Sequence, residues 1–427
     1  MHQHKNIFYT LFIVILLATE FYYIDVFGGA LRVYHFLALF VILLLNRFIP
    51  RLPITGLFWA LFWFLSVNAL AAAFADIPSE AFKSLGLLAA NMSIAIAVAL
   101  ILISERLNLE QVIRIALAVA VAGVVFGIVQ VAAFKLGGLN LGLSESQQGQ
   151  ITGGFAPGFR TEANSFAKNL NVVFLLTVPT LLTYARKATS LFVGGILVMG
   201  MLISFTRSAL YGLLVTLFIY YLWSVLSRRR RLFAKGPVIF LGLAGICLAV
   251  FVSTSGQFNE YATHKAATFF DSEEVLHGDS SAFRLESQGR LLHAFLDSGK
   301  TFLIGNGWGQ VRFFAYDREW QAGGAESVTA LGYAGILGGI FYFLYQLIAI
   351  NTVRQAVLCQ RSTSPSRFQE GLLLALVGVL VTGQINGSLL APEYWMLFGM
   401  AIACAYKHRC EVIANEELGR QYAMPNV

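Results

Sequence analysis

Long apolar runs separated by two extended polar stretches constrain this chain more than any other feature of its sequence. The polar stretches cover residues 135–165 and 254–327. The apolar runs around them are about 17–25 residues long, enough for a helix to cross roughly 30 Å of hydrocarbon. We therefore expect an all-α polytopic membrane protein, with a single membrane domain over residues 1–427 and both polar stretches folded beside the membrane.

Composition agrees with a membrane location. The chain is 57% hydrophobic and 12% charged, against roughly 45–50% and about 25% in soluble proteins. The apolar runs predict twelve spans, at residues 7–24, 30–46, 56–74, 85–104, 112–134, 166–185, 188–206, 208–226, 236–253, 328–350, 370–390 and 393–406.

The distribution of Lys and Arg predicts the orientation of these spans. Of the 30 such residues, 18 fall on the side of both termini, which leaves 12 on the side of the polar stretches. An excess of Lys and Arg marks cytoplasmic loops, so both termini are expected in the cytoplasm and both polar stretches on the opposite face. The net charge of +7 is then a signal of topology, and no nucleic-acid partner is expected. The arginine run 228–231 is expected to lie against anionic lipid.

Several familiar motifs do not occur in the sequence. The first apolar run ends without a small-residue cleavage site, so it is expected to remain as a helix rather than to be removed as a signal peptide. No CxxC, HExxH, P-loop or GxSxG pattern occurs, which leaves metal, nucleotide and serine-hydrolase chemistry without support. The four cysteines lie in spans or on the cytoplasmic side, and no disulfide is expected.

Arg207 is the first candidate for an anion site, because it stands between two apolar runs. A charge so close to hydrocarbon is costly unless something compensates for it. Its neighbours Thr206 and Ser208 offer hydroxyl groups beside a guanidinium that can bind phosphate oxygens in a two-pronged contact. The alternative is an arginine whose side chain reaches out to the membrane interface.

Arg160, Glu162 and Asn164 stand where the first polar stretch enters the next apolar run. A helix beginning near Asn164 would direct the positive end of its dipole outward, which suits an anion. The alternative is a capped helix start with a solvated Arg–Glu pair.

The second polar stretch contributes further charged candidates. Apolar residues at helical spacing predict an amphipathic helix over 284–302, lying on the membrane or capping the spans. Arg284 and Arg290 are six residues apart on it and face different directions, so one is expected to point to the core and the other to solvent. Glu326 is the last charge before a predicted span, where an acid is also favoured by the helix dipole alone.

The order of these motifs resembles the O-antigen ligase and polymerase superfamily, which are bacterial inner-membrane enzymes of surface-polysaccharide assembly. The resemblance is carried by Arg160 to Asn164 before a span and by Ser-Phe-Thr-Arg-Ser at 204–208. It continues with Gly-Arg-Leu-Leu-His at 289–293 ahead of Ile-Gly-Asn-Gly-Trp-Gly at 304–309, then Gly-Tyr-Ala-Gly-Ile-Leu-Gly-Gly at 332–339.

The resemblance implies an active site at the periplasmic face of the bacterial inner membrane, with no metal and no cofactor. The expected donor is a glycan on a polyprenyl pyrophosphate, and the expected acceptor is a glycan hydroxyl. Arg207 and Arg290 would hold the pyrophosphate, whose developing charge fixed guanidinium groups stabilise. The resemblance also leaves room for a partner protein that regulates chain length.

One departure from the family bears on the reaction. Ligases of the superfamily carry a His-Asn pair where this chain has Glu326-Ser327. This leaves two readings: Glu326 is the base that accepts the proton of the acceptor hydroxyl, or the site works differently. The departure favours a polymerase of lipid-linked repeat units over a ligase that transfers finished glycan to lipid A-core. A flippase or transporter is a third reading. We expect neither buried charges nor an internal repeat in this chain, which argues against that reading. A non-catalytic assembly subunit is a fourth.

Overall fold

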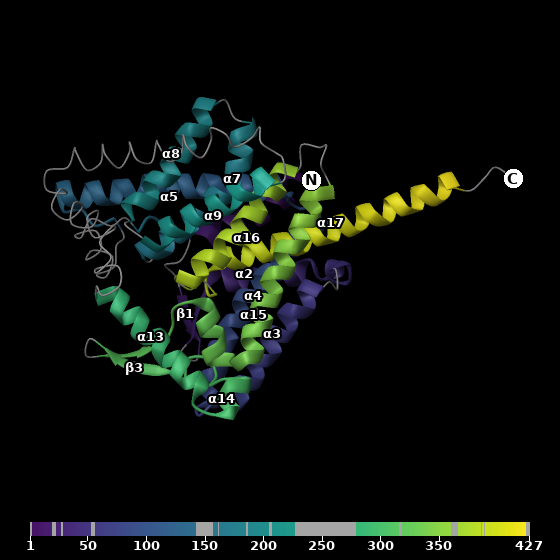
Figure 1. Ribbon diagram of the computed structural model, residues 1–427. Helices are drawn as coiled ribbons and strands as arrows, with labels where there is room; N and C mark the ends of the chain where they lie inside the picture. Colours follow the sequence, from purple (N-terminus) through teal and green to yellow (C-terminus); the bar gives the residue numbers. More distant parts are fainter. Residues whose placement is uncertain are drawn as a thin grey trace.

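The computed structural model describes residues 2–18, 23–26, 29–52, 56–141, 157–160, 162–184, 187–204, 207–226, 279–315, 318–359, 366–385, 387 and 389–423. Within these ranges the protein is helical apart from two short antiparallel hairpins (Figure 1). The N-terminal region and the long helix α17 lie toward the upper right of the view, and α13, α14 and β3 lie at the bottom.

Each predicted span except 236–253, which falls outside the described residues, coincides with a helix. The helices are α1 (His2–Ala18), α2 (Val33–Leu44), α3 (Gly56–Ala73), α4 (Pro78–Ile103), α5 (Leu109–Gly137), α7 (Ala163–Tyr184), α8 (Lys187–Ile203), α9 (Arg207–Leu226), α15 (Glu326–Cys359), α16 (Ser366–Ile385) and α17 (Pro392–Ala423). A short 3₁₀ helix, η1 (Asn46–Arg51), follows α2.

Among the described residues, five helices are long and apolar enough to cross a membrane. They are Gly56–Ala73, Pro78–Ile103, Leu109–Phe134, Glu326–Leu358 and Arg367–Ile385. These helices indicate a multi-pass membrane protein, while the full number of twelve spans stays a prediction.

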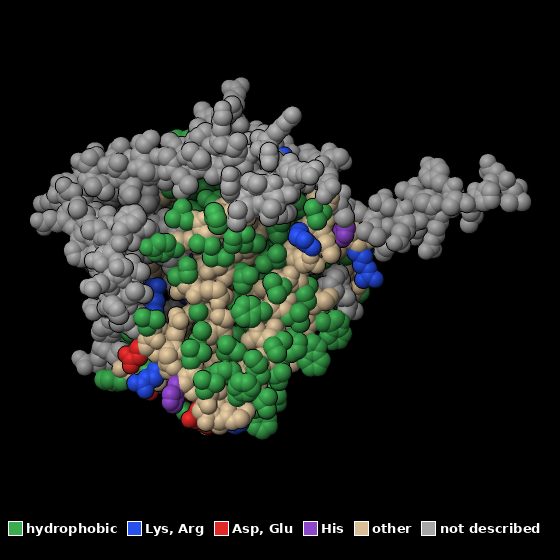
Figure 2. Space-filling view, viewed as in Figure 1, with side chains coloured by type: hydrophobic (Ala, Val, Ile, Leu, Met, Phe, Trp, Pro, Cys, Tyr) green, Lys and Arg blue, Asp and Glu red, His purple; other side chains and the backbone are tan. Residues whose placement is uncertain are grey.

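The outward faces of α3 and α15 carry large apolar side chains, as expected of helices in contact with lipid. Figure 2 shows a broad band of hydrophobic side chains over this face, with charged side chains gathered below and beside it. The exposed apolar residues of the two helices include Trp59, Phe62, Trp63, Leu70, Leu337, Ile340, Phe343, Leu344 and Leu347. Because soluble monomers rarely expose so large an apolar surface, the band supports a membrane environment.

The first two predicted spans were too long. Helix α1 ends at Ala18, and the chain then forms a hairpin of β1 (Tyr23–Val26) and β2 (Gly29–Arg32), with Tyr23 opposite Arg32. Aromatic and β-branched residues favour strands, and the glycine pair at 28–29 interrupts any helix. The hairpin therefore replaces the end of one predicted helix and the start of the next.

The described part of the second polar stretch, from residue 279 onward, packs as a layer against α15. It contains α13 (Asp279–Leu296), α14 (Gly299–Ile304) and the hairpin of β3 (Arg312–Ala315) with β4 (Arg318–Gln321). The amphipathic helix predicted over 284–302 is divided in two, because the Ser298 side chain accepts a hydrogen bond from Thr301 N and starts a new helix. Leu291 and Phe295 of α13 are buried, so α13 caps the spans.

Glycines bring the turn after α14 directly against α15. Gly305 and Gly307 have φ of 80° and 85°, a conformation open mainly to glycine. A Cβ on Gly305 would lie 2.4 Å from the Tyr333 carbonyl, and one on Gly335 would lie 2.4 Å from the Leu303 carbonyl oxygen. Helix α15 is itself broken at Gly335, where φ is 66° and ψ is −167°. The turn at 304–309 therefore lies in close backbone contact with α15.

Close packing also joins α7, α9 and α16. A Cβ on Gly371 of α16 would lie 2.0 Å from the Leu176 carbonyl oxygen of α7, and one on Gly212 of α9 would lie 1.9 Å from Thr382 Cγ2. Small residues at such contacts let helix backbones approach closely, as is common between membrane helices.

Candidate functional site

Glu326, the first residue of α15, is held by a chain of hydrogen bonds although it is only 1% exposed. The Tyr342 hydroxyl donates to Glu326 Oε2 at 2.7 Å, and Gln384 Nε2 donates to the Tyr342 hydroxyl at 3.1 Å. Ser327 Oγ donates to Gln384 Oε1 at 2.5 Å. The carboxylate is therefore fixed between α15 and α16.

Glycines of α16 and of the segment after it provide the space that this carboxylate occupies. A Cβ on Gly383 would lie 2.6 Å from Glu326 Cδ and 2.8 Å from Oε2. A Cβ on Gly387 would lie 2.8 Å from the Gly324 carbonyl oxygen and 3.6 Å from Glu326 Cγ. A side chain at Gly383 would displace the carboxyl group.

Helix α13 positions the backbone that leads into Glu326. Ser287 Oγ donates to the Gly323 carbonyl oxygen and accepts from Gly323 N, both at 2.6 Å. Gly324 has a φ of 149°, and a Cβ there would lie 2.5 Å from Gln288 Cγ. The amide of Gly387 donates to the Gly324 carbonyl at 2.9 Å. Helix α13 and the region after α16 thus both hold residues 323–325, which lead into Glu326.

Lys168, near the start of α7, reaches the same place from a third direction. Its Nζ donates to the Gly387 carbonyl oxygen at 2.7 Å. The ammonium group also interacts electrostatically with four charged side chains, namely Glu326, Glu393, Arg284 and Glu162.

Arg160 and Glu393 form a buried ion pair beside this cluster. Arg160 Nη2 and Glu393 Oε2 are 3.0 Å apart, and the two side chains are 1% and 3% exposed. Both charges act on the buried phenol of Tyr34 at the start of α2. Removing one partner of such a pair leaves a buried charge and typically costs about 3–5 kcal/mol.

The cluster as a whole balances its charges. Three cations and three carboxylates meet at the starts of α7, α15 and α17 and on α13: Arg160, Lys168 and Arg284 with Glu162, Glu326 and Glu393. An anionic ligand bound here would need an exchange of ion-pair partners or a further cation.

A cavity of about 370 Å³ opens on Glu326. Its walls combine apolar side chains, polar side chains and glycine backbone: Ser84, Leu87, Trp308, Gly309, Gln321, Ala322, Gly323, Gly324, Glu326, Thr329, Tyr333, Gly387, Leu389 and Leu390. Its volume lies within the range of about 300–1,000 Å³ that is usual for small-molecule sites.

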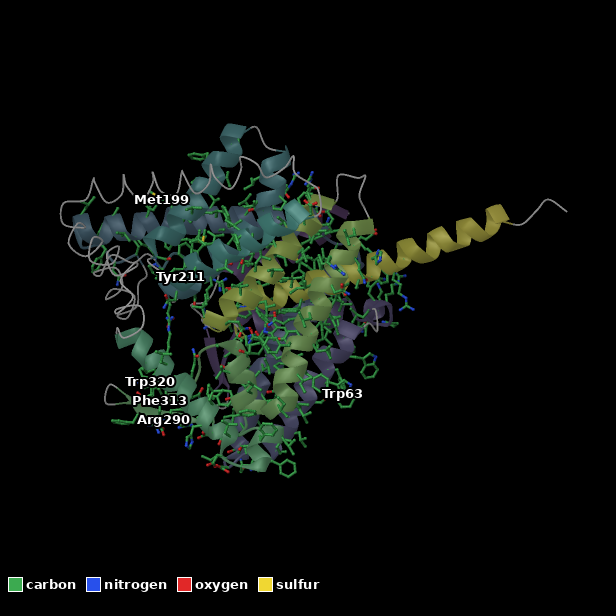
Figure 3. All side chains as sticks on the ribbon, viewed as in Figure 1. Trp63, Met199, Tyr211, Arg290, Phe313 and Trp320 are labelled. Atoms are coloured by element: carbon green, nitrogen blue, oxygen red, sulfur yellow. The ribbon has the colours of Figure 1, made fainter. Side chains whose placement is uncertain are left out.

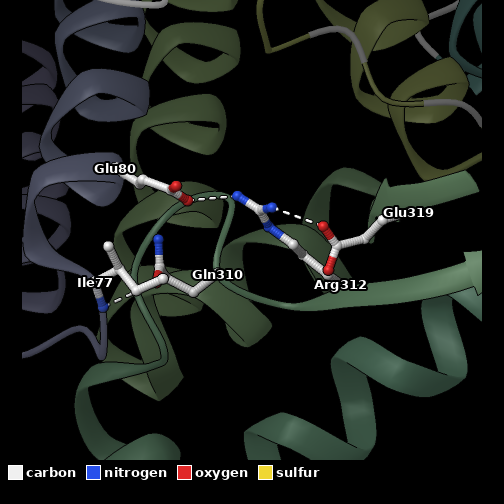
Figure 4. Close-up of polar contacts among 5 residues, drawn as sticks. All are labelled: Ile77, Glu80, Gln310, Arg312 and Glu319. Carbon is white, nitrogen blue, oxygen red and sulfur yellow. Dashed lines mark hydrogen bonds and ion pairs between the residues drawn. The ribbon is translucent and has the colours of Figure 1, made fainter.

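Polar contacts attach the wall of this cavity to the loop between α3 and α4 (Figure 4). Gln310 Oε1 accepts from Ile77 N at 3.1 Å, and Arg312 pairs with Glu80 and, at 2.9 Å, with Glu319. The hydrogen bond to Glu319 raises the pKa of Arg312. The Trp308 indole donates to the buried Asn68 of α3. These contacts hold the turn at 305–309 in place.

The structure brings together four of the candidate residues from the sequence and leaves others elsewhere. Arg160, Glu162, Arg284 and Glu326 belong to the charged cluster. Helix α7 begins at Ala163, so Asn164 lies inside its first turn rather than at its cap.

The arginine candidates at 207 and 290 are placed differently. Arg207 is the first residue of α9. The structure describes the backbone of Arg207 and Ser208 but not their side chains, and Thr206 lies outside the described residues. Arg290 is 61% exposed and pairs with Glu286 at 3.4 Å. In Figure 3 it lies beside Phe313 and Trp320, far from Tyr211 of α9. Of the two arginines on α13, Arg284 is the one that faces the cluster, as their spacing allowed.

Two members of the cluster, Lys168 and Glu393, were missed by the sequence reasoning. Both stand within the first residues of a predicted span, where they were counted as parts of apolar runs. A charge in the first turn of an apolar run was the available signal, because such charges are costly unless they are paired.

The expectation that no charge is buried was wrong. Arg160, Glu326, Glu370 and Glu393 are all at most 3% exposed, and Glu370 pairs with Arg367 at 2.9 Å. They are tolerated because they have polar partners near helix ends. One of the two arguments against a transporter therefore falls.

No group of three or more His, Cys, Asp or Glu side chains that could hold a metal ion occurs among the described residues. The chain matches no protein-family model and no curated protein sequence.

Proposed function

We propose that the protein is a membrane glycosyltransferase that joins polyprenyl-pyrophosphate-linked repeat units at the periplasmic face of a bacterial inner membrane. The observation that carries the proposal is Glu326, a buried carboxylate that opens on a cavity and interacts electrostatically with Lys168, in a cluster that also holds Arg160 and Arg284. The order of motifs that resembles the O-antigen polymerase superfamily supports the same reading, as do the twelve spans that the sequence predicts.

In the proposed reaction an acceptor hydroxyl attacks the anomeric carbon of the donor sugar. A new carbon–oxygen bond forms as the bond to the pyrophosphate breaks, and the leaving group departs as lipid pyrophosphate. Glu326 takes the proton of the attacking hydroxyl, the role of a general base within hydrogen-bond reach. Cationic side chains stabilise the charge that develops on the pyrophosphate, an effect that is strong where water is excluded.

Charge balance supports a part for Arg207. The six charged groups of the cluster neutralise one another, so a pyrophosphate needs added positive charge. Arg207 stands at the beginning of α9, which packs against α7 and α16, and it is the proposed donor ligand together with Arg284 and Lys168. The exposed Arg290 is the weaker candidate of the two that the family resemblance implies.

A genetic experiment tests the proposal and separates it from its competitors. The gene is deleted, the strain is complemented with the wild-type chain or with Glu326→Gln at matched membrane level, and surface glycan is analysed. Single repeat units capped on lipid A, with no polymer in the Glu326→Gln strain, are the expected result. The fold loss expected for the purified variant is roughly 10²–10⁴, the range of general acid–base groups.

Other outcomes identify the alternatives. Uncapped core with accumulated lipid-linked polymer would indicate a ligase. Lipid-linked repeat units retained on the cytoplasmic side would indicate a transporter, a reading that the buried charges favour. Normal polymer from Glu326→Gln would remove Glu326 from the chemistry and leave Glu162 as the next candidate base.

A further inference from the structure

The cavity beside Glu326 differs in charge from the cluster on the other side of the carboxylate. Glu326 is the one ionisable acid or base among the described residues that form its walls, apart from the phenol of Tyr333. Lys168 and Arg284 are not among those residues. Lys168 contacts the walls through its hydrogen bond to the Gly387 carbonyl oxygen, but no described lining side chain is a cation. A pyrophosphate here would face the Glu326 carboxylate, so the cavity is unsuited to the charged part of the donor.

The polar groups of the cavity suit a neutral ligand with several hydroxyls. A Cβ on Gly309 would lie 3.0 Å from Gln321 Nε2 and 3.1 Å from Ser84 Oγ, so these two groups converge at a glycine with a φ of 74°. Within the described part of the chain, neither side chain has a hydrogen-bond partner. Both are therefore available to donate to, and accept from, a bound molecule.

The aromatic walls supply the apolar counterpart. The Trp308 indole N–H is used by Asn68 and the Tyr333 hydroxyl by the Ala322 carbonyl. Their rings, with centroids 5.3 Å apart, consequently offer apolar surface to the cavity. A sugar ring has C–H faces that pack on aromatic rings and hydroxyls around its edge, which is the combination that these walls match.

We propose that this cavity binds an uncharged sugar residue, the terminal residue of the acceptor glycan, with one hydroxyl directed at Glu326. The assignment of this sugar as acceptor rests on the proposed function. Glu326 then belongs to two neighbouring regions: the cavity, which takes the nucleophile, and the charged cluster with Lys168 and Arg284, which takes the leaving group together with the added positive charge of Arg207.

The test measures binding rather than turnover, on the full chain purified into lipid nanodiscs. The neutral probes are methyl glycosides of hexoses, 6-deoxyhexoses and N-acetylhexosamines, followed by saturation-transfer NMR. The anionic probe is inorganic pyrophosphate, followed by calorimetry. The variants are Ser84→Leu, which fills the cavity, and Lys168→Met, which removes a cation on the other side. Gly289→Ala is the matched control, because a Cβ there meets nothing within 4 Å.

We expect at least one neutral glycoside to bind. Ser84→Leu should weaken glycoside binding at least tenfold, whereas Lys168→Met should weaken pyrophosphate binding and leave glycoside binding unchanged. Gln321→Ala and Thr329→Val, which do not enlarge a side chain, give the same glycoside loss if Ser84→Leu does not fold. Binding of no neutral glycoside, binding of glycuronides alone, or loss of pyrophosphate from the cavity variants would overturn the proposal. Glycoside binding by a chain whose deletion leaves the surface polymer unchanged would instead refute the proposed function alone.

Discussion

At the scale of single residues, the site depends on glycines, which leave space, as much as on its charged side chains. The Glu326 carboxyl occupies the space that a side chain at Gly383 would fill. Because this contact involves the carboxyl group itself, a substitution at Gly383 can move the Glu326 carboxylate without changing its chemical identity.

Gly383→Ala is expected to move the Glu326 carboxylate and lower turnover by about 10²-fold, since a displacement of about 1 Å can cost that much. Membrane level and thermal stability are expected to change less than turnover. A Gly195→Ala variant, whose Cβ would meet nothing within 4 Å, is the control and should keep wild-type turnover. Equal losses in both variants would contradict the prediction.

The Tyr342 hydroxyl is expected to position Glu326 rather than to react. Tyr342→Phe removes one hydrogen bond to a carboxylate, a contribution of about 1.5–3 kcal/mol, so turnover should fall about 10–100-fold. The pH–rate profile of the purified enzyme should also shift, because the carboxylate loses a donor. An unchanged pH profile together with a lower yield of folded protein would assign Tyr342 to stability alone.

Arg207→Lys is expected to fail almost as completely as Arg207→Ala. A lysine is a point charge and does not reproduce the two-pronged contact of a guanidinium with pyrophosphate. Polymer length on a gel, at matched protein level, is the measurement. Normal polymer from the lysine variant would show that the position needs only positive charge.

At the scale of helices and turns, the sequence predicted most elements and few of their contacts. Runs of apolar residues located the helices because each run has the length of a membrane helix. The hairpin at Tyr23–Arg32 was missed because its strands are apolar, and short apolar strands resemble helix ends in composition. The glycine-rich motifs at 304–309 and 332–339 are visible in the sequence, but the break of α15 at Gly335 is not.

The cluster could be predicted only in part for a related reason. Arg160, Glu162 and Glu326 stood out because they flank apolar runs, and Arg284 because it lies on the predicted amphipathic helix. The pairing of Arg160 with Glu393 joins residues 233 positions apart, and no local spacing encodes such a contact. Lys168 was hidden because its site is formed by a backbone carbonyl, that of Gly387, which leaves no mark in the sequence.

The Arg160–Glu393 pair is expected to connect the start of α17 to the segment before α7. Arg160→Met and Glu393→Leu should each destabilise the protein by about 3–5 kcal/mol. The double variant should be less destabilised than the sum, since it leaves neither charge behind. Thermal unfolding in nanodiscs, analysed as a double-mutant cycle, measures this coupling. Additive effects would mean that the pair contributes no coupling.

At the scale of the whole molecule, α13 lies toward the bottom of Figure 1, and α15 extends from there toward its end at Cys359 near the top. In a variant without native cysteines, Gly289→Cys should react with a membrane-impermeant thiol reagent in spheroplasts. Arg354→Cys should react only after the membrane is opened. Both positions are exposed, so burial does not explain a difference. The reverse pattern would invert the orientation and place the site in the cytoplasm.

The long sequence separation of Arg160 and Glu393 has a consequence for biogenesis. Spans emerge from the ribosome in order, and Arg160 is synthesised long before Glu393. Lys168 is likewise synthesised before Gly387, whose carbonyl accepts its hydrogen bond. Glu326 is synthesised before Gln384, which reaches it through the Tyr342 hydroxyl. The charged cluster is therefore completed only when α16 and α17 have been inserted. A chain truncated before α16 carries most of the predicted spans but cannot assemble this cluster.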